Sequence, residues 1–224
     1  MQAFIFDLDG TLIDSLADIA EAVNRALAEH GFPTQPLALF PKFIGEGVAT
    51  LVERAVPPEV LPKLDVPSMI ADYQRHYGDT WREKTRPYDG MLEAINALRA
   101  AGMRTAVISN KPDRFTTLCC AHFFPAGSFD VVRGARDGVP RKPNPRAALE
   151  VATALGVTPG QCAYVGDSGI DMEFAVKSGM FPVGVLWGFR DEAELRNGGA
   201  KTLIKSPQEL IKLLRNGAAL EKSR

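Results

Sequence analysis

The chain has 224 residues, of which 46% are hydrophobic and 24% are charged, and its formal net charge is −1. This composition is ordinary for a globular protein, and the small net charge excludes general electrostatic recruitment to nucleic acid or to a membrane surface. No apolar run is long enough to span a membrane, and the three cysteines lack metal-ligand spacing. We therefore expect reduced cysteines and a cytoplasmic protein, with monomer and homodimer both open.

The first predicted element is a strand over residues 3–6, which ends in two aspartates. Asp7 and Asp9 are separated by one residue, so in an extended conformation their side chains project to the same side. Carboxylates this close require a shared proton or a neutralising cation. Gly10 then permits a sharp turn, and Thr11 offers a hydroxyl and a backbone N–H that suit a phosphate oxygen. The alternative is an acidic turn without a ligand.

The next part of the chain has helical spacing only. Residues 16–30 carry apolar side chains at helical intervals, and no strand pattern appears between residues 37 and 81. We therefore predict an all-helical insert over residues 15–83, set into a core that is formed by residues 1–14 and 84–224.

Beyond this insert, apolar segments alternate between strand and helix patterns. The predicted strands cover residues 105–108, 129–132, 162–165, 182–186 and 202–204. This alternation predicts an α/β fold in which helices cover both faces of a parallel sheet.

Polar residues directly follow three of the predicted strands, where an open parallel sheet places its ligand crevice. Beside the two aspartates after the first strand, these residues are Ser109, Asn110 and Asp167. Asp171 follows in the first turn of a predicted helix, where it could instead stabilise the helix N-terminus. Four carboxylates in one crevice would require a cation. Oxygen ligands without His or Cys favour Mg²⁺ where phosphate completes the shell.

Lys142 lies in a stiff stretch between prolines, which could present its ammonium to a phosphate. The alternative is a solvated surface lysine, and Arg141 competes for the same role. A metal, a carboxylate pair, a hydroxyl–amide cluster and a lysine together indicate phosphoryl transfer. In such chemistry one aspartate can form an aspartyl-phosphate, while a second protonates the leaving oxygen and then activates water.

With these motifs the sequence resembles the phosphatases of the haloacid dehalogenase-like superfamily over nearly its whole length. Four motifs match in order: Asp7-Leu8-Asp9-Gly10-Thr11, Ser109-Asn110, Lys142, and Gly166-Asp167 with Asp171. The resemblance implies a Rossmann-like, doubly wound parallel core with an inserted helical cap. It also implies Mg²⁺ as the cofactor and a small phosphorylated metabolite as the substrate, with no nucleic-acid or membrane partner.

The resemblance also implies a role for each of these residues. Asp7 would be the nucleophile and Asp9 the general acid and base. The implied metal ligands are Asp7, the backbone carbonyl of Asp9, Asp167 and, in support, Asp171. The implied phosphate contacts are Ser109, Asn110 and Lys142, to which the hydroxyl of Thr11 adds a further candidate.

Four further segments are similar in sequence to the phosphoglycolate phosphatases within this superfamily. They are residues 14–19, 43–47, 109–112 and 185–189. We therefore predict an Mg²⁺-dependent phosphomonoester hydrolase that works through an aspartyl-phosphate, with 2-phosphoglycolate as the favoured substrate. Pyrophosphate, a sugar phosphate and a nucleotide are the alternative substrates. A non-catalytic phosphate- or protein-binding module is the alternative from another class.

The cap is expected to select the substrate. Gly45-Glu46-Gly47 could form a loop that closes over the crevice, or a plain turn between helices. Lys42 and Arg54 flank this loop and could meet a substrate carboxylate, or remain solvated on the helix surface. Closing of the cap would exclude water from the first step, and opening would admit it for the second.

Overall fold

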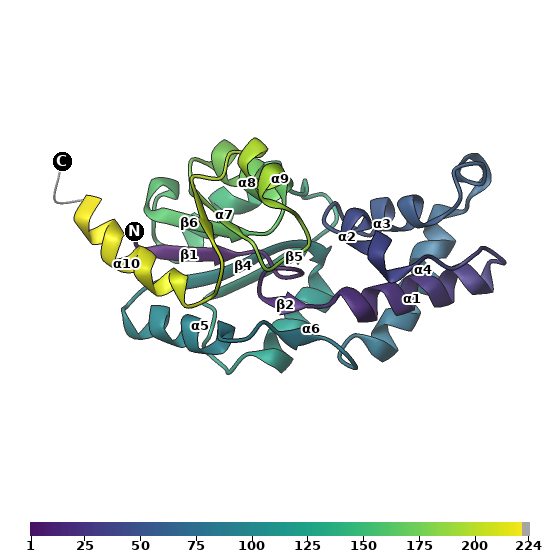
Figure 1. Cartoon of the computed structure of the whole chain (residues 1–224), viewed down its shortest axis with the longest axis horizontal. Helices are drawn as coiled ribbons and strands as arrows, with labels where there is room; N and C mark the ends of the chain where they lie inside the picture. Colours follow the sequence, from purple (N-terminus) through teal and green to yellow (C-terminus); the bar gives the residue numbers. More distant parts are fainter. Residues whose placement is uncertain (221–224) are drawn as a thin grey trace.

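The computed structural model describes residues 1–220, so the end of the predicted core at residue 224 lies outside the described part. A six-stranded parallel sheet, in the order β5-β4-β1-β6-β7-β8, forms the centre of the fold (Figure 1). Its strands are β1 (Ala3–Phe6), β4 (Arg104–Pro112), β5 (Val131–Ala135), β6 (Cys162–Gly166), β7 (Phe181–Val185) and β8 (Thr202–Ile204). The predicted Rossmann-like parallel α/β core is therefore confirmed.

Helices cover both faces of this sheet. They are α5 (Met91–Ala100), α6 (Asp113–Phe123), α7 (Arg146–Leu155), α8 (Gly169–Ser178), α9 (Glu192–Asn197) and α10 (Glu209–Leu220), with a 3₁₀ turn at Pro159–Gln161. Alternate side chains of β1 face opposite layers. Ala3 and Ile5 pack with residues of α7 and α8, whereas Phe4 and Phe6 pack with residues of α5 and α6. Of the helices within residues 1–220, none combines the length and the hydropathy that a membrane crossing requires.

A second group of helices, called the cap below, lies beyond the carboxyl ends of the strands (Figure 1). It comprises α1 (Leu16–Glu29), α2 (Phe40–Phe43), α3 (Val48–Ala55) and α4 (Val66–Thr80), with 3₁₀ turns at Leu37–Leu39 and Leu61–Lys63. In α1, Ile19, Val23 and Leu27 recur at helical spacing and are buried, so one face of the helix packs inward. The predicted domain boundaries near residues 15 and 83 stay a prediction.

Two chain segments connect the cap to the core, and the antiparallel pair β2 (Ile13–Asp14) and β3 (Arg86–Pro87) joins them. Inside this junction Asp18 is only 1% exposed. Its carboxylate accepts hydrogen bonds from Lys84 N at 3.0 Å, Thr85 N at 2.8 Å and Thr85 Oγ1 at 2.7 Å. Asp18 therefore fixes the start of α1 to the segment by which the chain returns to the core.

The main difference from the sequence prediction concerns β4. The apolar pattern predicts a strand over residues 105–108, but the observed strand runs on to Pro112. Ser109, Asn110 and Lys111 belong to this extension, where the pairing of β4 with β5 shifts in register. These polar residues are therefore held by an irregular strand end and not by a loop.

We expect Asp18→Ala to lower the free energy of unfolding by about 2–4 kcal/mol, because the buried N–H and hydroxyl of Thr85 would lose their acceptor. Urea unfolding followed by circular dichroism measures this change. The control is Glu21→Ala on the same helix, where the side chain is 40% exposed and pairs with Arg25. This control should change stability by less than about 0.5 kcal/mol. Equally small effects of both substitutions would contradict the role given to Asp18.

Candidate active site

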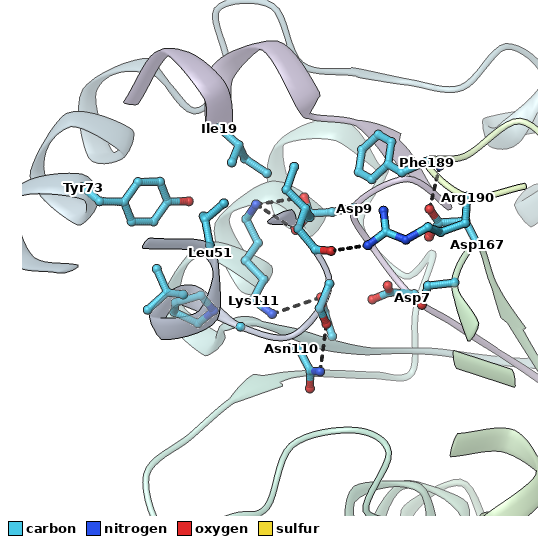
Figure 2. A pocket seen from close by; sticks show the side chains of 17 residues that line it. Asp7, Asp9, Ile19, Leu51, Tyr73, Asn110, Lys111, Asp167, Phe189 and Arg190 are labelled. Carbon is cyan, nitrogen blue, oxygen red and sulfur yellow. Dashed lines mark hydrogen bonds and ion pairs between the residues drawn. The ribbon is translucent and has the colours of Figure 1, made fainter. Parts of the chain in front are cut away.

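A pocket lies between the cap and the carboxyl ends of β1, β4 and β6 (Figure 2). On the core side it is lined by polar residues, among them Asp7, Asp9, Ser109, Asn110, Lys111 and Asp167. The cap contributes a mainly apolar wall of Ile19, Ile44, Val48, Leu51 and Tyr73. The fold therefore brings together, at one edge of the sheet, the polar residues that follow three strands in the sequence.

Three carboxylates meet beneath this pocket. One oxygen from each of Asp7, Asp167 and Asp171 lies within 4.8 Å of the others, and all three residues are buried. Burial, together with the neighbouring carboxylates, raises the pKa of Asp7 to about 6 and that of Asp167 to about 8. The protein groups alone thus leave the cluster short of positive charge. Buried oxygen ligands of this kind fit a hard divalent cation.

Asp167 is fixed by neighbours from two other segments. Its carboxylate accepts hydrogen bonds from Thr11 Oγ1 at 3.0 Å and from the Phe189 N–H at 2.8 Å. Gly10 has a φ of 81°, and a Cβ at this position would lie 2.3 Å from an Asp167 oxygen. Only glycine leaves this carboxylate in place. The Thr11 hydroxyl therefore supports Asp167 and does not line the pocket, in contrast to its predicted contact with phosphate.

Asp171 contacts both a helix terminus and the acidic cluster. Its Oδ2 accepts hydrogen bonds from Ser168 Oγ at 2.6 Å and Ser168 N at 3.1 Å, which forms a capping box at the start of α8. Its Oδ1 accepts a hydrogen bond from Lys142 Nζ at 2.7 Å. Asp171 therefore caps the N-terminus of α8, as the alternative prediction had it, and also belongs to the acidic cluster.

Lys142, and not Arg141, reaches the acidic cluster. Its Nζ lies 2.9 Å from Asp7 Oδ1, 2.7 Å from Asp171 Oδ1 and 3.0 Å from the Tyr164 hydroxyl. Burial alone would lower the pKa of Lys142, but Asp171 and Asp7 raise it well above its usual value. The side chain therefore stays an ammonium. Sequence reasoning missed Tyr164, because a tyrosine on a buried strand resembles an ordinary core residue.

Asn110 connects the lysine segment with the cap. Its side-chain oxygen accepts a hydrogen bond from Lys142 N at 2.9 Å, and its amide nitrogen donates to the carbonyls of Gly45 at 3.0 Å and Lys142 at 3.2 Å. These contacts make Asn110 a positioning residue in this structure. Of the phosphate contacts expected from the sequence, Ser109 lines the pocket, and its hydroxyl accepts a hydrogen bond from Lys111 N at 3.3 Å.

Two side chains hold Asp9. Ser15 Oγ donates to Asp9 Oδ1 at 2.6 Å, and Lys111 Nζ lies 2.8 and 3.1 Å from the two carboxylate oxygens. The ammonium also lies 4.5 Å from the centre of the Tyr77 ring in α4. Burial would lower the pKa of Lys111, but Asp9 raises it above its usual value. Sequence reasoning gave Lys111 no role, and its only signal was its place in residues 109–112.

The cap loop at residues 45–47 lies at the edge of the pocket. Gly45 and Gly47 line the pocket directly. Beside them, Arg190 of the core donates through Nη2 to the carbonyl of Ile44 at 2.9 Å. Two core side chains therefore attach the loop to the core in this structure: Asn110 of β4 and Arg190 from the segment after β7.

The other predicted cap residues lie outside the pocket. Arg54 donates hydrogen bonds to the Glu46 carboxylate and to the carbonyl of Lys42, so it contacts both of the other residues. Lys42 and Arg54 are exposed, and none of the three residues lines the pocket. The structure therefore does not bring these side chains to the place where the sequence prediction puts a substrate carboxylate.

The fold and the pocket together define a capped α/β enzyme, in which acidic residues at the edge of a parallel sheet meet the wall of a helical cap. The model of the haloacid dehalogenase-like hydrolase family matches residues 4–185, and the chain belongs to this family. The resemblance seen in the sequence motifs is thereby confirmed.

Relatives and solved structures cover most of the chain. This chain is 33% identical to a phosphoglycolate phosphatase of Thiobacillus denitrificans, and the match covers 80% of each of the two chains. It is 32% identical to a plasmid-borne phosphoglycolate phosphatase of Cupriavidus necator, which covers 95% of this chain and 92% of the relative. The structure of a putative phosphoglycolate phosphatase from Lactobacillus delbrueckii superposes with a TM-score of 0.88 at 32% identity, covering 95% of this chain and 97% of that one.

When a chelator keeps the protein free of metal, its free energy of unfolding should fall as the pH rises from 6 to 8. The pKa of Asp167 in the folded state is about 8, against a usual value of 3.8. The folded state therefore keeps a proton that the unfolded state releases, so each rise in pH within this window favours unfolding. Added Mg²⁺ should restore stability at the higher pH, because it binds the folded state.

Urea unfolding at several pH values measures this decline. Asp167→Asn removes the carboxyl group and should flatten it, whereas Asp14→Asn, at an exposed position, should leave the pH dependence unchanged. Parallel curves for the wild type and Asp167→Asn would contradict the interpretation.

Proposed function

We propose that this protein is an Mg²⁺-dependent phosphatase of small phosphomonoesters, with 2-phosphoglycolate as the favoured substrate. The observation that carries the proposal is the convergence of three buried carboxylates with the Lys142 ammonium beneath a cap-covered pocket. Relatives named phosphoglycolate phosphatase support the choice of substrate. The cytoplasmic location is part of the same proposal, supported by the buried free thiols of Cys119, Cys120 and Cys162.

The residues present fit the proposed cation. Asp7, the backbone carbonyl of Asp9, and Asp167 would hold Mg²⁺, with Asp171 in support. When bound, the ion would neutralise charge on the phosphoryl group. Lys142 contributes a fixed positive charge to the same place, since its Nζ lies 2.9 Å from Asp7 Oδ1. This lysine orients the Asp7 carboxylate and keeps part of its charge neutralised.

In the first step, an Asp7 oxygen attacks phosphorus and the bond between phosphorus and the ester oxygen breaks. Asp9 gives a proton to that oxygen, so the leaving group departs as an alcohol. In the second step, Asp9 takes a proton from water, and the water oxygen attacks the aspartyl-phosphate. Phosphate is released and Asp7 returns to its free carboxylate. Ser109 lines the pocket, and its hydroxyl would bind a phosphate oxygen.

The cap would separate these two steps. In this structure the cap loop is attached to the core through the hydrogen bonds of Asn110 with Gly45 and of Arg190 with Ile44. Closure keeps water away from the first step, and release of these few contacts admits water for the second. The mainly apolar cap wall suits a small leaving group.

Phosphate release from a panel of phosphate esters and pyrophosphate tests the function. We expect a higher kcat/KM for 2-phosphoglycolate than for pyrophosphate, hexose phosphates, nucleoside monophosphates or p-nitrophenyl phosphate. Activity should disappear in EDTA and return with Mg²⁺. Activity that persists in chelator would contradict the metal role, and a higher kcat/KM for another ester would replace the proposed substrate. No turnover by folded, Mg²⁺-loaded protein would favour the non-catalytic module.

Asp7→Asn should reduce kcat by at least about a thousandfold, because the amide cannot replace the nucleophilic carboxylate. The free energy of unfolding, measured in parallel, should show that the variant is folded. Asp14→Asn is the matched control at an exposed carboxyl near the junction, and it should keep wild-type kcat. An active Asp7→Asn variant would refute the assignment of the nucleophile.

A further inference from the structure

One buried ammonium of the pocket has no part in the steps given above. Among the residues that line the pocket, the cations are Lys111 and Arg190. The guanidinium of Arg190 is engaged, because Nη2 donates to the Ile44 carbonyl at 2.9 Å and Nε lies 3.2 Å from Glu194. The Lys111 side chain is only 4% exposed and extends its ammonium to Asp9. Lys111 is therefore the buried cation on the side of the pocket where Asp9 acts.

The position of Asp9 places Lys111 relative to a substrate. Asp9 is proposed to protonate the ester oxygen, so the leaving group occupies the space beside this carboxylate. Lys111 Nζ lies 2.8 and 3.1 Å from the two Asp9 oxygens. A charge on the leaving group would therefore lie close to the Lys111 ammonium. Figure 2 shows Ile19 and Leu51 of the cap entering the pocket on this side.

The surroundings of this space favour a small anion over other groups. The cap wall is formed by Ile19, Ile44, Val48, Leu51 and Tyr73, and of these only Tyr73 carries a side-chain hydrogen-bonding group, a neutral hydroxyl. A carboxylate against such a wall loses hydration and needs a charged partner. An ammonium has three donors, and among the described side chains Asp9 is the acceptor to which Lys111 donates. The ammonium also lies 4.5 Å from the centre of the Tyr77 ring, so a ligand oxygen would compete with this ring for the remaining donor.

We propose that Lys111 is the specificity-determining residue of this site: its ammonium binds the carboxylate of the leaving group beside Asp9. The inference rests on the proposed phosphatase function and deepens it. The selected feature is a carboxylate one carbon away from the ester oxygen, as in 2-phosphoglycolate. The cap cations Lys42 and Arg54, for which the sequence suggested this role, lie outside the pocket.

The test compares 2-phosphoglycolate with 2-hydroxyethyl phosphate, which carries a neutral hydroxymethyl group in place of the carboxylate. The wild type should have a kcat/KM at least about tenfold higher for 2-phosphoglycolate, the size expected for a charge-assisted hydrogen bond. Lys111→Met should reduce this ratio by about tenfold to hundredfold, for the same reason. Lys111→Arg retains the positive charge and should retain part of the ratio.

Lys42→Met and Arg54→Met are the matched controls, since each removes a cap cation that lies outside the pocket. Both should keep the wild-type ratio. Equal losses on the two esters in Lys111→Met would overturn the inference, because Lys111 would then serve only to hold Asp9. A ratio that changes in the controls and not in Lys111→Met would overturn it as well.

Failure of the inference and failure of the proposed function are distinguishable. If the wild type hydrolyses both esters with equal kcat/KM, Lys111 does not select a carboxylate, and the phosphatase function stands. This result needs no variant, so it decides the question even if Lys111→Met does not fold. If the folded, Mg²⁺-loaded wild type hydrolyses neither ester nor any other of the panel, the phosphatase function fails and the inference fails with it.

Discussion

The burial of three carboxylates side by side is the constraint on which the rest of this structure depends. Asp7, Asp167 and Asp171 repel one another in a place where water cannot screen them. The chain offsets this repulsion with the ammonium of Lys142 and with hydrogen bonds such as that from Thr11. The offset is incomplete, since the pKa of Asp167 remains raised. An arrangement that is costly for folding is thereby ready to bind a cation.

The remaining acidic group, Asp9, is shared between the core and the cap. Ser15, which donates to Asp9, directly precedes α1, and Lys111 lies 4.5 Å from the centre of the Tyr77 ring in α4. Tyr77 in turn packs edge-on against Phe115 of α6, with ring centroids 5.0 Å apart. Movement of the cap would therefore change the surroundings of Asp9, the residue proposed to transfer protons. Closure of the pocket and placement of Asp9 are coupled by the same side chains.

The sequence predicts the core and the acidic part of the site well, because local rules determine both. Apolar strands followed by polar residues place Asp7 and Asp167 at the carboxyl edge of a parallel sheet, whatever the detailed packing. The choice between Lys142 and Arg141 depends on the path of one short segment, and only the structure decides it. The sequence does not predict a role for Tyr164, because its ring packs like that of an ordinary core residue. Only the contact of its hydroxyl with Lys142 sets it apart.

The cap is harder to predict, since short helices between prolines leave the direction of each side chain open. Lys42 and Arg54 have the right charge and lie near the right loop, yet Arg54 turns to Glu46 on the outside. Lys111 has an unremarkable place in the sequence but reaches the pocket from an irregular strand end.

A fold of this kind carries sites for different reactions, so the capped α/β fold does not by itself fix the substrate. The substrate must then be chosen by the few side chains that surround the leaving group. In this chain the pocket offers a mainly apolar cap wall and, beside Asp9, the buried ammonium of Lys111. Asp9, the proposed proton donor, and Lys111, the proposed anion receptor, form one ion pair, so a leaving group that carries a carboxylate would bring its ester oxygen to Asp9 as it binds.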